Sequence, residues 1–255
     1  MSLLRLDNVA LQRGERRLCQ SLNLDLEHGE VAAVLGKNGS GKTTLLQTLM
    51  YLLPAADGRI TLEGQPQGAF DRRQLARRVG MLFQDMPPEM PATVLETVLL
   101  GRHPHRDAYF WESDNDREIA TAAMAEMGIS GLASRQVASL SGGEKQRVAL
   151  ALLMAQAPTL YLLDEPGNHL DIKFQLQLLR YLRDKVKNQS GGIVMATHDI
   201  NLAARFSDRI ILMLGEGRPV TGPVTEVLTC ANLALAFECE FTEVSNGEQR
   251  YFFPV

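Results

Sequence analysis

Gly36-Lys37-Asn38-Gly39-Ser40-Gly41-Lys42-Thr43 is the stretch that decides the fold. It fits Gly-x-x-x-x-Gly-Lys-Ser/Thr and stands between an apolar run at 30–35, typical of a strand buried on both faces, and a helix-like stretch at 42–53. Glycines let the backbone wrap closely around phosphate groups, and the start of a helix adds positive partial charge. A merely flexible turn would not need the Lys-Thr pair at that spacing. We therefore predict a site for nucleotide phosphates, with the Lys42 cation at the β- and γ-phosphates and the Thr43 hydroxyl on Mg²⁺, formed by Gly36, Lys37, Asn38, Gly39, Ser40, Gly41, Lys42, Thr43 and Thr44.

An acidic pair, Asp164-Glu165, follows a second apolar run at 159–163. Carboxylates at the carboxyl end of a buried parallel strand face the ligand crevice of an α/β sheet. Alone, such a pair is equally typical of a solvated loop. Together with the phosphate loop it predicts that Asp164 holds Mg²⁺ through water and that Glu165 is the general base for an attacking water.

Composition and charge narrow the class of protein. The chain has 255 residues, of which 45% are hydrophobic and 22% charged, and its formal net charge is −4. This length suits one large α/β domain or a core with an inserted subdomain, and the negative charge argues against a nucleic-acid-binding surface. Cys19, Cys230 and Cys239 form no Cys-x-x-Cys pair, which is typical of free thiols in a reducing compartment. Neither a signal peptide nor an apolar run of about 18 residues is visible, so work at a membrane would require a partner.

A third motif, Leu140-Ser141-Gly142-Gly143-Glu144-Lys145-Gln146-Arg147, opens a long helix-like stretch. Locally, Ser141 fits an N-cap and Glu144 follows at the spacing of a capping box, which alone explains these two residues. However, Leu-Ser-Gly-Gly followed by Gln-Arg, shortly before Asp164-Glu165, resembles the signature sequence of the ABC ATPases. The resemblance implies ATP and Mg²⁺ as cofactors and ATP hydrolysis as the reaction. It also implies that Ser141 and Gly143 contact the γ-phosphate of an ATP held by a second copy of the chain.

Three further positions match this family, in the family's order along the chain. Gln84 ends the apolar run 79–84, as the Q-loop glutamine does, which implies contact with Mg²⁺ and the attacking water. His198 follows the apolar run 192–196, as the switch histidine does, which implies contact with the γ-phosphate; a histidine after a strand is usually structural, but the order and spacing here favour the switch. Asn168–Asp171 resembles the D-loop, which crosses the dimer interface. The predicted catalytic residues are thus Glu165, His198 and Gln84, and the predicted metal contacts are Thr43, Gln84 and Asp164.

The sequence departs from the family at the adenine site. Members usually carry an aromatic residue near the start of the chain that stacks on adenine, whereas the matching stretch, 9–14, holds none. Either Leu11 or Arg13 covers the base, since an arginine plane can stack on it, or selectivity for adenine is weak. We therefore expect modest discrimination between ATP and GTP. Gly167, where many relatives have Thr, is a second and minor departure.

The alternation of strand and helix patterns predicts an α/β fold with a mostly parallel sheet and right-handed crossovers. Short alternating strands before residue 30, joined by a polar turn at 12–17, predict an N-terminal antiparallel β-subdomain. The resemblance implies a P-loop NTPase core of the RecA-like type. We expect a single ABC ATPase domain over 1–255. It divides into a nucleotide-binding core with the β-subdomain (1–85 and 158–218), an inserted helical subdomain with the signature motif (86–157), and a short C-terminal tail (219–255) with a helix near 224–237 and a terminal strand pair.

The resemblance also implies partners. Two copies would hold two ATP molecules head to tail, each between Lys42 of one copy and Ser141 of the other. Transmembrane permease subunits would dock at Met86–Pro91 and Gly101–His105, which places the chain on the cytoplasmic face of the membrane. A periplasmic or surface binding protein would act only indirectly. His103 and His105 lack a third ligand at metal-site spacing, so we interpret them as loop residues.

Gly101–His105 and Asn168–Asp171 further resemble the branch of the family that imports ferric siderophores, haem and cobalamin. This analogy, and not the chemistry of the site, implies the cargo. Zinc or manganese import is the nearest alternative. A non-transport role such as iron–sulfur assembly stays open, whereas relatives that act on ribosomes carry two cassettes and those in DNA repair carry long inserts.

Overall fold

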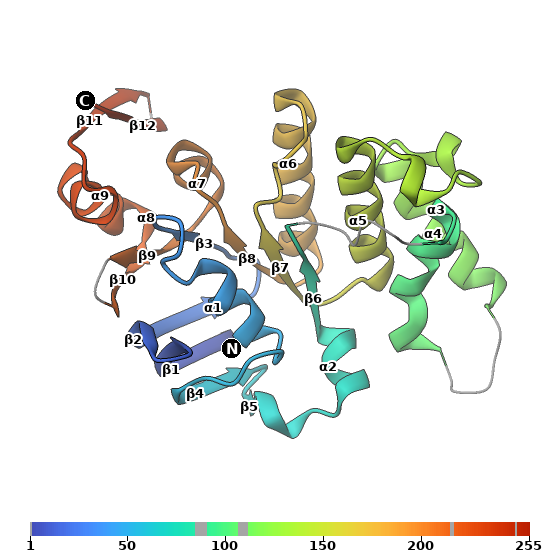
Figure 1. Cartoon of the computed structure of the whole chain (residues 1–255), viewed down its shortest axis with the longest axis horizontal. Coiled ribbons are helices and arrows are strands. Elements are labelled where there is room, and N and C mark those ends of the chain that lie inside the picture. The colour runs from blue at the N-terminus through green and yellow to red at the C-terminus, as the bar shows by residue number, and fades with distance from the viewer. Residues whose placement is uncertain (1, 85–90, 107–111, 215–216, 248) are drawn as a thin grey trace.

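The computed structural model of the chain describes residues 2–84, 91–106, 112–214, 217–247 and 249–255. Its centre is a six-stranded sheet in the order β10-β9-β3-β8-β7-β6 (Figure 1). All neighbouring strands run parallel except β10 and β9, which are antiparallel. The strands are β3 (Val31–Leu35), β6 (Val79–Leu82), β7 (Leu160–Asp164), β8 (Gly192–Ala196), β9 (Arg209–Leu214) and β10 (Arg218–Pro223). The predicted α/β class with a mostly parallel sheet is confirmed.

A second, antiparallel sheet comes from the N-terminal part of the chain, in the order β2-β1-β4-β5. The first two strands are longer than predicted, because the β1–β2 ladder continues through the pairs Gln12–Arg17 and Arg13–Arg16. The polar turn expected over 12–17 is therefore wrong, and only Gly14 and Glu15 form the turn. Gly14 has a φ of 60°, which such a two-residue turn requires and glycine adopts without strain. The strands of this sheet are β1 (Ser2–Arg13), β2 (Arg16–Glu27), β4 (Asp57–Leu62) and β5 (Gln65–Pro66).

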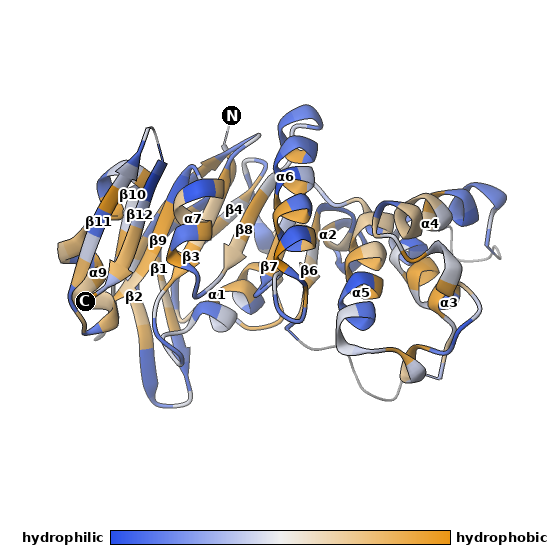
Figure 2. Ribbon diagram, turned by 90° about the horizontal axis from the view of Figure 1, so that it is seen from above, coloured by the Kyte–Doolittle hydropathy of each residue, from blue (hydrophilic) through white to orange (hydrophobic). Residues whose placement is uncertain are grey.

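Apolar side chains cover both faces of the central sheet. In β3, Val31, Ala33 and Leu35 belong to the core on one face, and Ala32 and Val34 to the core on the other. The first core includes buried residues of α6 (Ile172–Asn188) and α7 (Ile200–Phe206); the second joins the sheet to α1 (Lys42–Leu49) and the antiparallel sheet. α6 is apolar along one side and polar along the other (Figure 2). Burial on both faces explains why β3 shows no alternation of polar and apolar residues.

A group of helices lies beyond the β6 edge of the central sheet (Figure 1). Capping boxes at Thr93, Ser113 and Ser141 fix where α3, α4 and α5 begin, since each of these side chains accepts a backbone N–H of the first turn. Within the predicted helical subdomain, the sequence has helix-like patterns at 94–100, 114–127 and 141–155, and the observed helices agree with them to within one residue at each end. No predicted helix corresponds to α2 or α7. The group comprises α3 (Val94–Leu99), a 3-10 turn at Leu100–His105, α4 (Asp114–Glu126) and α5 (Gly142–Gln156), with α2 (Arg72–Arg78) leading into β6.

The C-terminal part corrects one prediction and confirms another. The single helix expected near 224–237 is two helices, α8 (Val224–Val227) and α9 (Cys230–Phe237), because Thr229 caps the second by accepting the backbone N–H of Asn232. The predicted terminal strand pair is β11 (Phe241–Asn246) and β12 (Gln249–Pro254). Across the described part of the chain, no helix is both long enough and apolar enough to span a membrane.

Candidate functional site

The phosphate loop connects β3 to α1, and its glycines hold backbone conformations that other residues rarely adopt. Gly36, Gly39 and Gly41 have φ angles of 153°, 76° and 105°. A Cβ atom at Gly36 would lie 2.8 Å from Ser40 Oγ and 2.9 Å from Met213 Cβ, closer than a side chain tolerates. The loop therefore requires glycine at this position, for its φ angle and for the close approach of β9.

Lys42 begins α1, and its side chain folds back over the loop. The residue is buried, and Nζ donates to the carbonyl oxygens of Gly36 at 2.8 Å and Lys37 at 3.1 Å. An ammonium group has three N–H donors, so a third remains for a phosphate oxygen. Burial lowers the pKa of Lys42, and the charges of Glu165 and Asp164 oppose that shift. The cation thus lies between the loop and two carboxylates.

Asp164 ends β7 and lines the same pocket as the other predicted metal ligands. Burial raises the pKa of Asp164, while a hydrogen bond with the Thr43 side chain and the charge of Lys42 oppose the rise. Gln84 lies two residues beyond β6, which ends earlier than predicted, and lines the same pocket as Thr43 and Asp164. Mg²⁺ prefers oxygen ligands such as a hydroxyl, a carboxylate and an amide oxygen. A nearby cation also offsets the free-energy cost of burying the carboxylate charge. The three residues therefore fit Mg²⁺ bound together with nucleotide phosphates.

Glu165 and His198 follow the neighbouring strands β7 and β8, and their side chains meet. His198 Nδ1 lies 2.7 Å from Glu165 Oε2. Glu165 has a φ of 51°, and its backbone N–H donates to Ala196 O at 3.0 Å, which ties the turn after β7 to the end of β8. Left-handed conformations of residues other than glycine occur often at functional turns. The structure therefore joins the predicted base and the predicted switch residue in one hydrogen bond.

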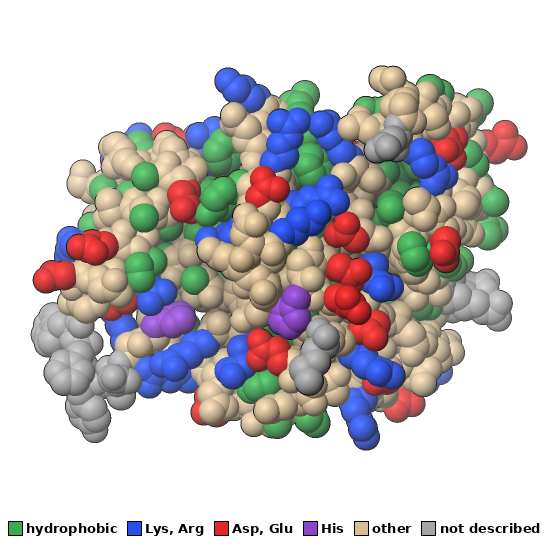
Figure 3. Space-filling model, turned by 180° about the vertical axis from the view of Figure 1, so that it is seen from behind, with side chains coloured by type: hydrophobic (Ala, Val, Ile, Leu, Met, Phe, Trp, Pro, Cys, Tyr) green, Lys and Arg blue, Asp and Glu red, His purple; other side chains and the backbone are tan. Residues whose placement is uncertain are grey.

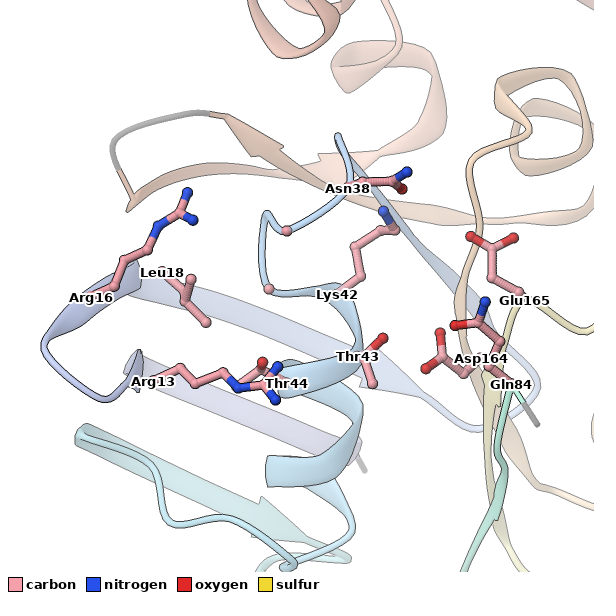
Figure 4. Close-up of a pocket in the computed structure, with 12 residues that line it drawn as sticks. Arg13, Arg16, Leu18, Asn38, Lys42, Thr43, Thr44, Gln84, Asp164 and Glu165 are labelled. Atoms are coloured by element: carbon pink, nitrogen blue, oxygen red, sulfur yellow. The ribbon is translucent and has the colours of Figure 1, made fainter. Parts of the chain in front are cut away.

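These groups face one pocket of about 480 Å³ (Figure 4). Asp164, Glu165 and Gln84 lie on one side of Lys42 and Thr43, and two arginines with a leucine lie on the other side. The lining residues are Arg13, Arg16, Leu18, Asn38, Gly39, Gly41, Lys42, Thr43, Thr44, Gln84, Asp164 and Glu165. The pocket thus has an acidic end, which holds Glu165 and Gln84 of the predicted catalytic residues, and a basic end.

The residues at the basic end of the pocket decide between the two side chains, Leu11 and Arg13, that were predicted to cover the nucleobase. Leu11 has no exposed surface and belongs to the core beneath the sheet, so the interpretation that it covers the base is wrong. Arg13 does line the pocket, together with Arg16 and Leu18, which sequence reasoning missed. A signal was present for Arg16, because a two-residue turn puts it opposite Arg13. The wider turn assumed for 12–17 concealed it.

Ser141 and Gly143 line a different pocket, of about 550 Å³, which shares no lining residue with the first. The Ser141 hydroxyl donates to Glu144 Oε2 at 2.8 Å and caps α5. A Cβ atom at Gly143 would lie 2.9 Å from His169 O, so the D-loop approaches the start of α5 closely enough to favour glycine there. One chain therefore does not bring Ser141 and Lys42 to the same pocket. The pocket is lined by Gly128, Ile129, Gly131, Leu132, Ser141, Gly143, Glu144, Arg147, His169, Leu170 and Asp171.

The segments expected to meet a permease are described in part. Residues 86–90 lie outside the described residues, and Pro91 is exposed. In the 3-10 turn, His105 Nε2 lies 2.8 Å from Gln156 O, and Arg102 Nε donates to Asp116 Oδ1 at 3.0 Å. Burial lowers the pKa of His105. These contacts hold the turn against α5 and α4.

A phosphate loop, a strand-end acidic pair and a capped signature helix on one α/β chain define an ATP-binding cassette. In agreement, the family described as ABC transporter matches residues 19–168. The chain belongs to the ABC transporter family, as its ATP-binding subunit, and the prediction that it is an ATPase is confirmed.

Individual relatives cover most of the chain. Ferric enterobactin transport ATP-binding protein FepC of Escherichia coli (strain K12) is 35% identical over 227 residues, 89% of this chain and 83% of the relative. Iron(3+)-hydroxamate import ATP-binding protein FhuC of Bacillus subtilis (strain 168) is 34% identical over 242 residues, 94% of this chain and 89% of the relative. Among solved structures, an inward-facing ABC transporter described as of metal-chelate type has a TM-score of 0.85 and 28% identity, covering 100% of this chain and 98% of its own. The dimeric cassette MJ0796 bound to ADP and Pi has a TM-score of 0.75 and 28% identity, covering 87% and 98%.

Proposed function

We propose that two copies of this chain bind and hydrolyse Mg-ATP to drive the import of an iron chelate or cobalamin through separate membrane permease subunits. The observation that supports ATP hydrolysis most strongly is the convergence of Lys42, Asp164 and Glu165 at one pocket, with His198 hydrogen-bonded to Glu165. The cargo rests on relatives, which include FepC, FhuC and a cobalamin import ATP-binding protein of Halobacterium salinarum that is 34% identical over 222 residues.

The chemistry follows from the roles of the pocket residues. Glu165 accepts a proton from the water that attacks the γ-phosphorus, while the bond to the bridging oxygen breaks and its electron pair leaves with ADP. With both ring nitrogens protonated, His198 would hold the Glu165 carboxylate through Nδ1 and donate to the γ-phosphate through Nε2. Lys42 and the loop N–H groups stabilise the negative charge on the phosphates. Thr43, Gln84 and Asp164 would hold Mg²⁺, which supplies further charge neutralisation.

The separate Ser141 pocket supports a site shared between two copies. The N–H groups at the start of α5, next to Gly143, suit an anion presented from outside the chain, and the Ser141 hydroxyl would join them on releasing Glu144 Oε2. A second copy would present the γ-phosphate of its own ATP there, through a self-complementary two-fold contact. In this arrangement Gly101–His105 meets the permease, which places the chain at the cytoplasmic face of the membrane. A periplasmic or surface binding protein would act only indirectly.

Steady-state Mg-ATP hydrolysis, by the chain alone and co-purified with its permease, tests the motor. We expect Glu165→Gln to lower kcat by about a hundredfold or more with ATP binding kept, because an amide of the same shape cannot accept the proton. Glu118→Gln, at an exposed position of α4, is the matched control. Equal hydrolysis by Glu165→Gln and the wild type would remove Glu165 as the base.

The cargo requires a separate measurement in cells. Uptake of labelled ferric siderophore, cobalamin, zinc and manganese is compared between cells with the wild-type chain and cells with Glu165→Gln. We expect loss of chelate or cobalamin uptake only. Loss of zinc or manganese uptake instead would support the alternative cargo.

A further inference from the structure

The basic end of the pocket carries two positive charges that no described residue neutralises. Arg13 and Arg16 stand directly opposite each other across the β1–β2 turn, which puts both side chains on one face of the sheet. Like charges in that position destabilise a strand pair. Within the described ranges, neither guanidinium group has a hydrogen bond or an ion pair. On the face drawn in Figure 3, by contrast, basic side chains lie interspersed with acidic ones.

The arginine pair adjoins the phosphate loop. Leu18 lines the same pocket as Arg16, and a Cβ atom at Gly41 would lie 3.1 Å from Leu18 Cβ. Figure 4 shows Arg13, Arg16 and Leu18 on the side of the loop opposite Glu165. A nucleotide whose terminal phosphates lie at Lys42 has the carboxylates on one side of it, so its nucleoside extends toward the arginines.

We propose that Arg13 and Arg16 hold the nucleoside end of the nucleotide, with a guanidinium plane stacked on the base above Leu18, so that the site accepts purine nucleoside triphosphates in general. This inference rests on the proposed nucleotide site. A guanidinium plane stacks on the π-face of any base and carries only hydrogen-bond donors, so it has no acceptor for the amino group of adenine. The contact is also electrostatic, because two cations lie near the polyphosphate. Weak base discrimination and salt-sensitive binding follow together from the same two residues.

Calorimetric binding of Mg-ATP and Mg-GTP at low and high salt tests the proposal. We expect wild-type affinities for the two nucleotides within about threefold of each other, since stacking does not depend strongly on the base. Arg13→Ala and Arg16→Ala should each weaken both nucleotides by about fivefold to tenfold and reduce the salt dependence. Arg16→Lys, which keeps the charge but loses the plane, should recover the salt dependence and only part of the affinity.

Arg17→Ala is the matched control. Arg17 lies on the same hairpin and is exposed, but it pairs with Gln12 on the other face and does not line the pocket. We expect its affinities to stay within about twofold of wild type, because only distant screened charge is lost. Thermal melts should show Arg16→Ala at least as stable as wild type, which separates lost binding from unfolding.

Two results would overturn the inference. The first is that Arg13→Ala and Arg16→Ala bind both nucleotides with the same affinity as Arg17→Ala. The second is that the wild type prefers ATP over GTP by more than about thirtyfold, because such a preference requires specific hydrogen bonds to the base. Binding of inorganic tripolyphosphate, which has no nucleoside, distinguishes failure of the arginine proposal from failure of the proposed function. If the wild type binds tripolyphosphate and Lys42→Ala does not, the phosphate site is supported. This holds even if Arg13→Ala and Arg16→Ala bind nucleotides as the wild type does. No binding of nucleotide or tripolyphosphate by the wild type would contradict the proposed function itself.

Discussion

The two ends of the nucleotide pocket differ in how their charges are held. At the phosphate end, Lys42 donates to two carbonyl oxygens of its own loop. The Asp164 side chain is hydrogen-bonded to Thr43, and the Glu165 side chain is hydrogen-bonded to His198. At the base end, Arg13 and Arg16 have no such partner among the described residues. The phosphate end is therefore fixed in advance of binding, whereas the base end depends on the ligand to neutralise it. This difference predicts that substitutions at the phosphate end abolish function and that those at the base end adjust it.

Lys42→Ala should give the largest effect and the strongest contrast. Removing a buried cation from between the loop and the carboxylates should weaken Mg-ATP binding by more than about a hundredfold, against about tenfold for either arginine. Calorimetry measures the binding, with Lys173→Ala, on the exposed surface of α6, as the control. Equal losses of affinity for Lys42→Ala and Arg16→Ala would contradict the difference between the two ends of the pocket.

Two glycine variants should show the difference between the two ends of the pocket in the free energy of unfolding. Gly36→Ala should lower the free energy of unfolding by about 2–4 kcal/mol, because both its φ angle and its contacts with Ser40 and Met213 exclude a Cβ atom. Gly14→Ala, in the β1–β2 turn, should cost only about 1 kcal/mol, because its φ is positive but no atom lies within 4 Å of the added Cβ. Urea unfolding of both variants measures the difference. A costlier Gly14→Ala would contradict the close approach at the phosphate end.

Asp164→Asn separates stability from activity. Burial raises the pKa of Asp164 in the folded state above its value in the unfolded chain. The folded chain is therefore stabilised while Asp164 is protonated, and it loses this stability as pH rises through the folded pKa. Asn resembles the protonated form, so Asp164→Asn should melt roughly 2–4 °C above wild type near pH 8 while its Mg-ATP hydrolysis is lost.

Thermal melts without nucleotide, from about pH 8 down to pH 4, check the sign of this effect. The advantage of Asp164→Asn should shrink toward low pH, where the wild-type carboxyl is also protonated. A variant that is less stable than wild type near pH 8 would contradict the cost of burying the Asp164 charge.

The smallest effect belongs to the exposed edge of the phosphate loop. Lys37 Nζ lies 2.5 Å from Glu238 Oε2, at the end of α9, and the glutamate side chain is 80% exposed. Such a surface pair contributes less than about 1 kcal/mol and is screened by salt. Glu238→Gln should therefore leave both the melting temperature and Mg-ATP affinity nearly unchanged at high salt. A large loss of affinity would mean that the C-terminal segment governs the loop.

Sequence reasoning reached the phosphate end because its residues are contiguous or follow directly after buried strands. Lys42, Thr43 and Asp164 stand at fixed places relative to β3, α1 and β7, so the local pattern places them. The base end depends on which residues face each other across a hairpin. The two-residue turn puts Arg16 opposite Arg13 at the pocket, and composition does not show where that turn lies.

The same limit explains other differences from the prediction. The break between α8 and α9 depends on one capping hydroxyl, Thr229, inside a run whose apolar pattern continues. The pairing of Glu165 with His198 depends on the order of β7 and β8 in the sheet, which only the structure supplies. The roles of these residues in catalysis stay predictions.

In the proposed dimer, Lys42 of one copy and Ser141 of another complete one ATP site. The most direct measurement is Mg-ATP hydrolysis by a mixture of Lys42→Ala and Ser141→Arg chains, co-purified with the permease, when each variant alone is folded but inactive. A mixed pair contains one intact site, so mixing should restore activity up to about a quarter of the wild-type rate. A mixture as inactive as the separate variants, beside an active wild type, would contradict the shared site.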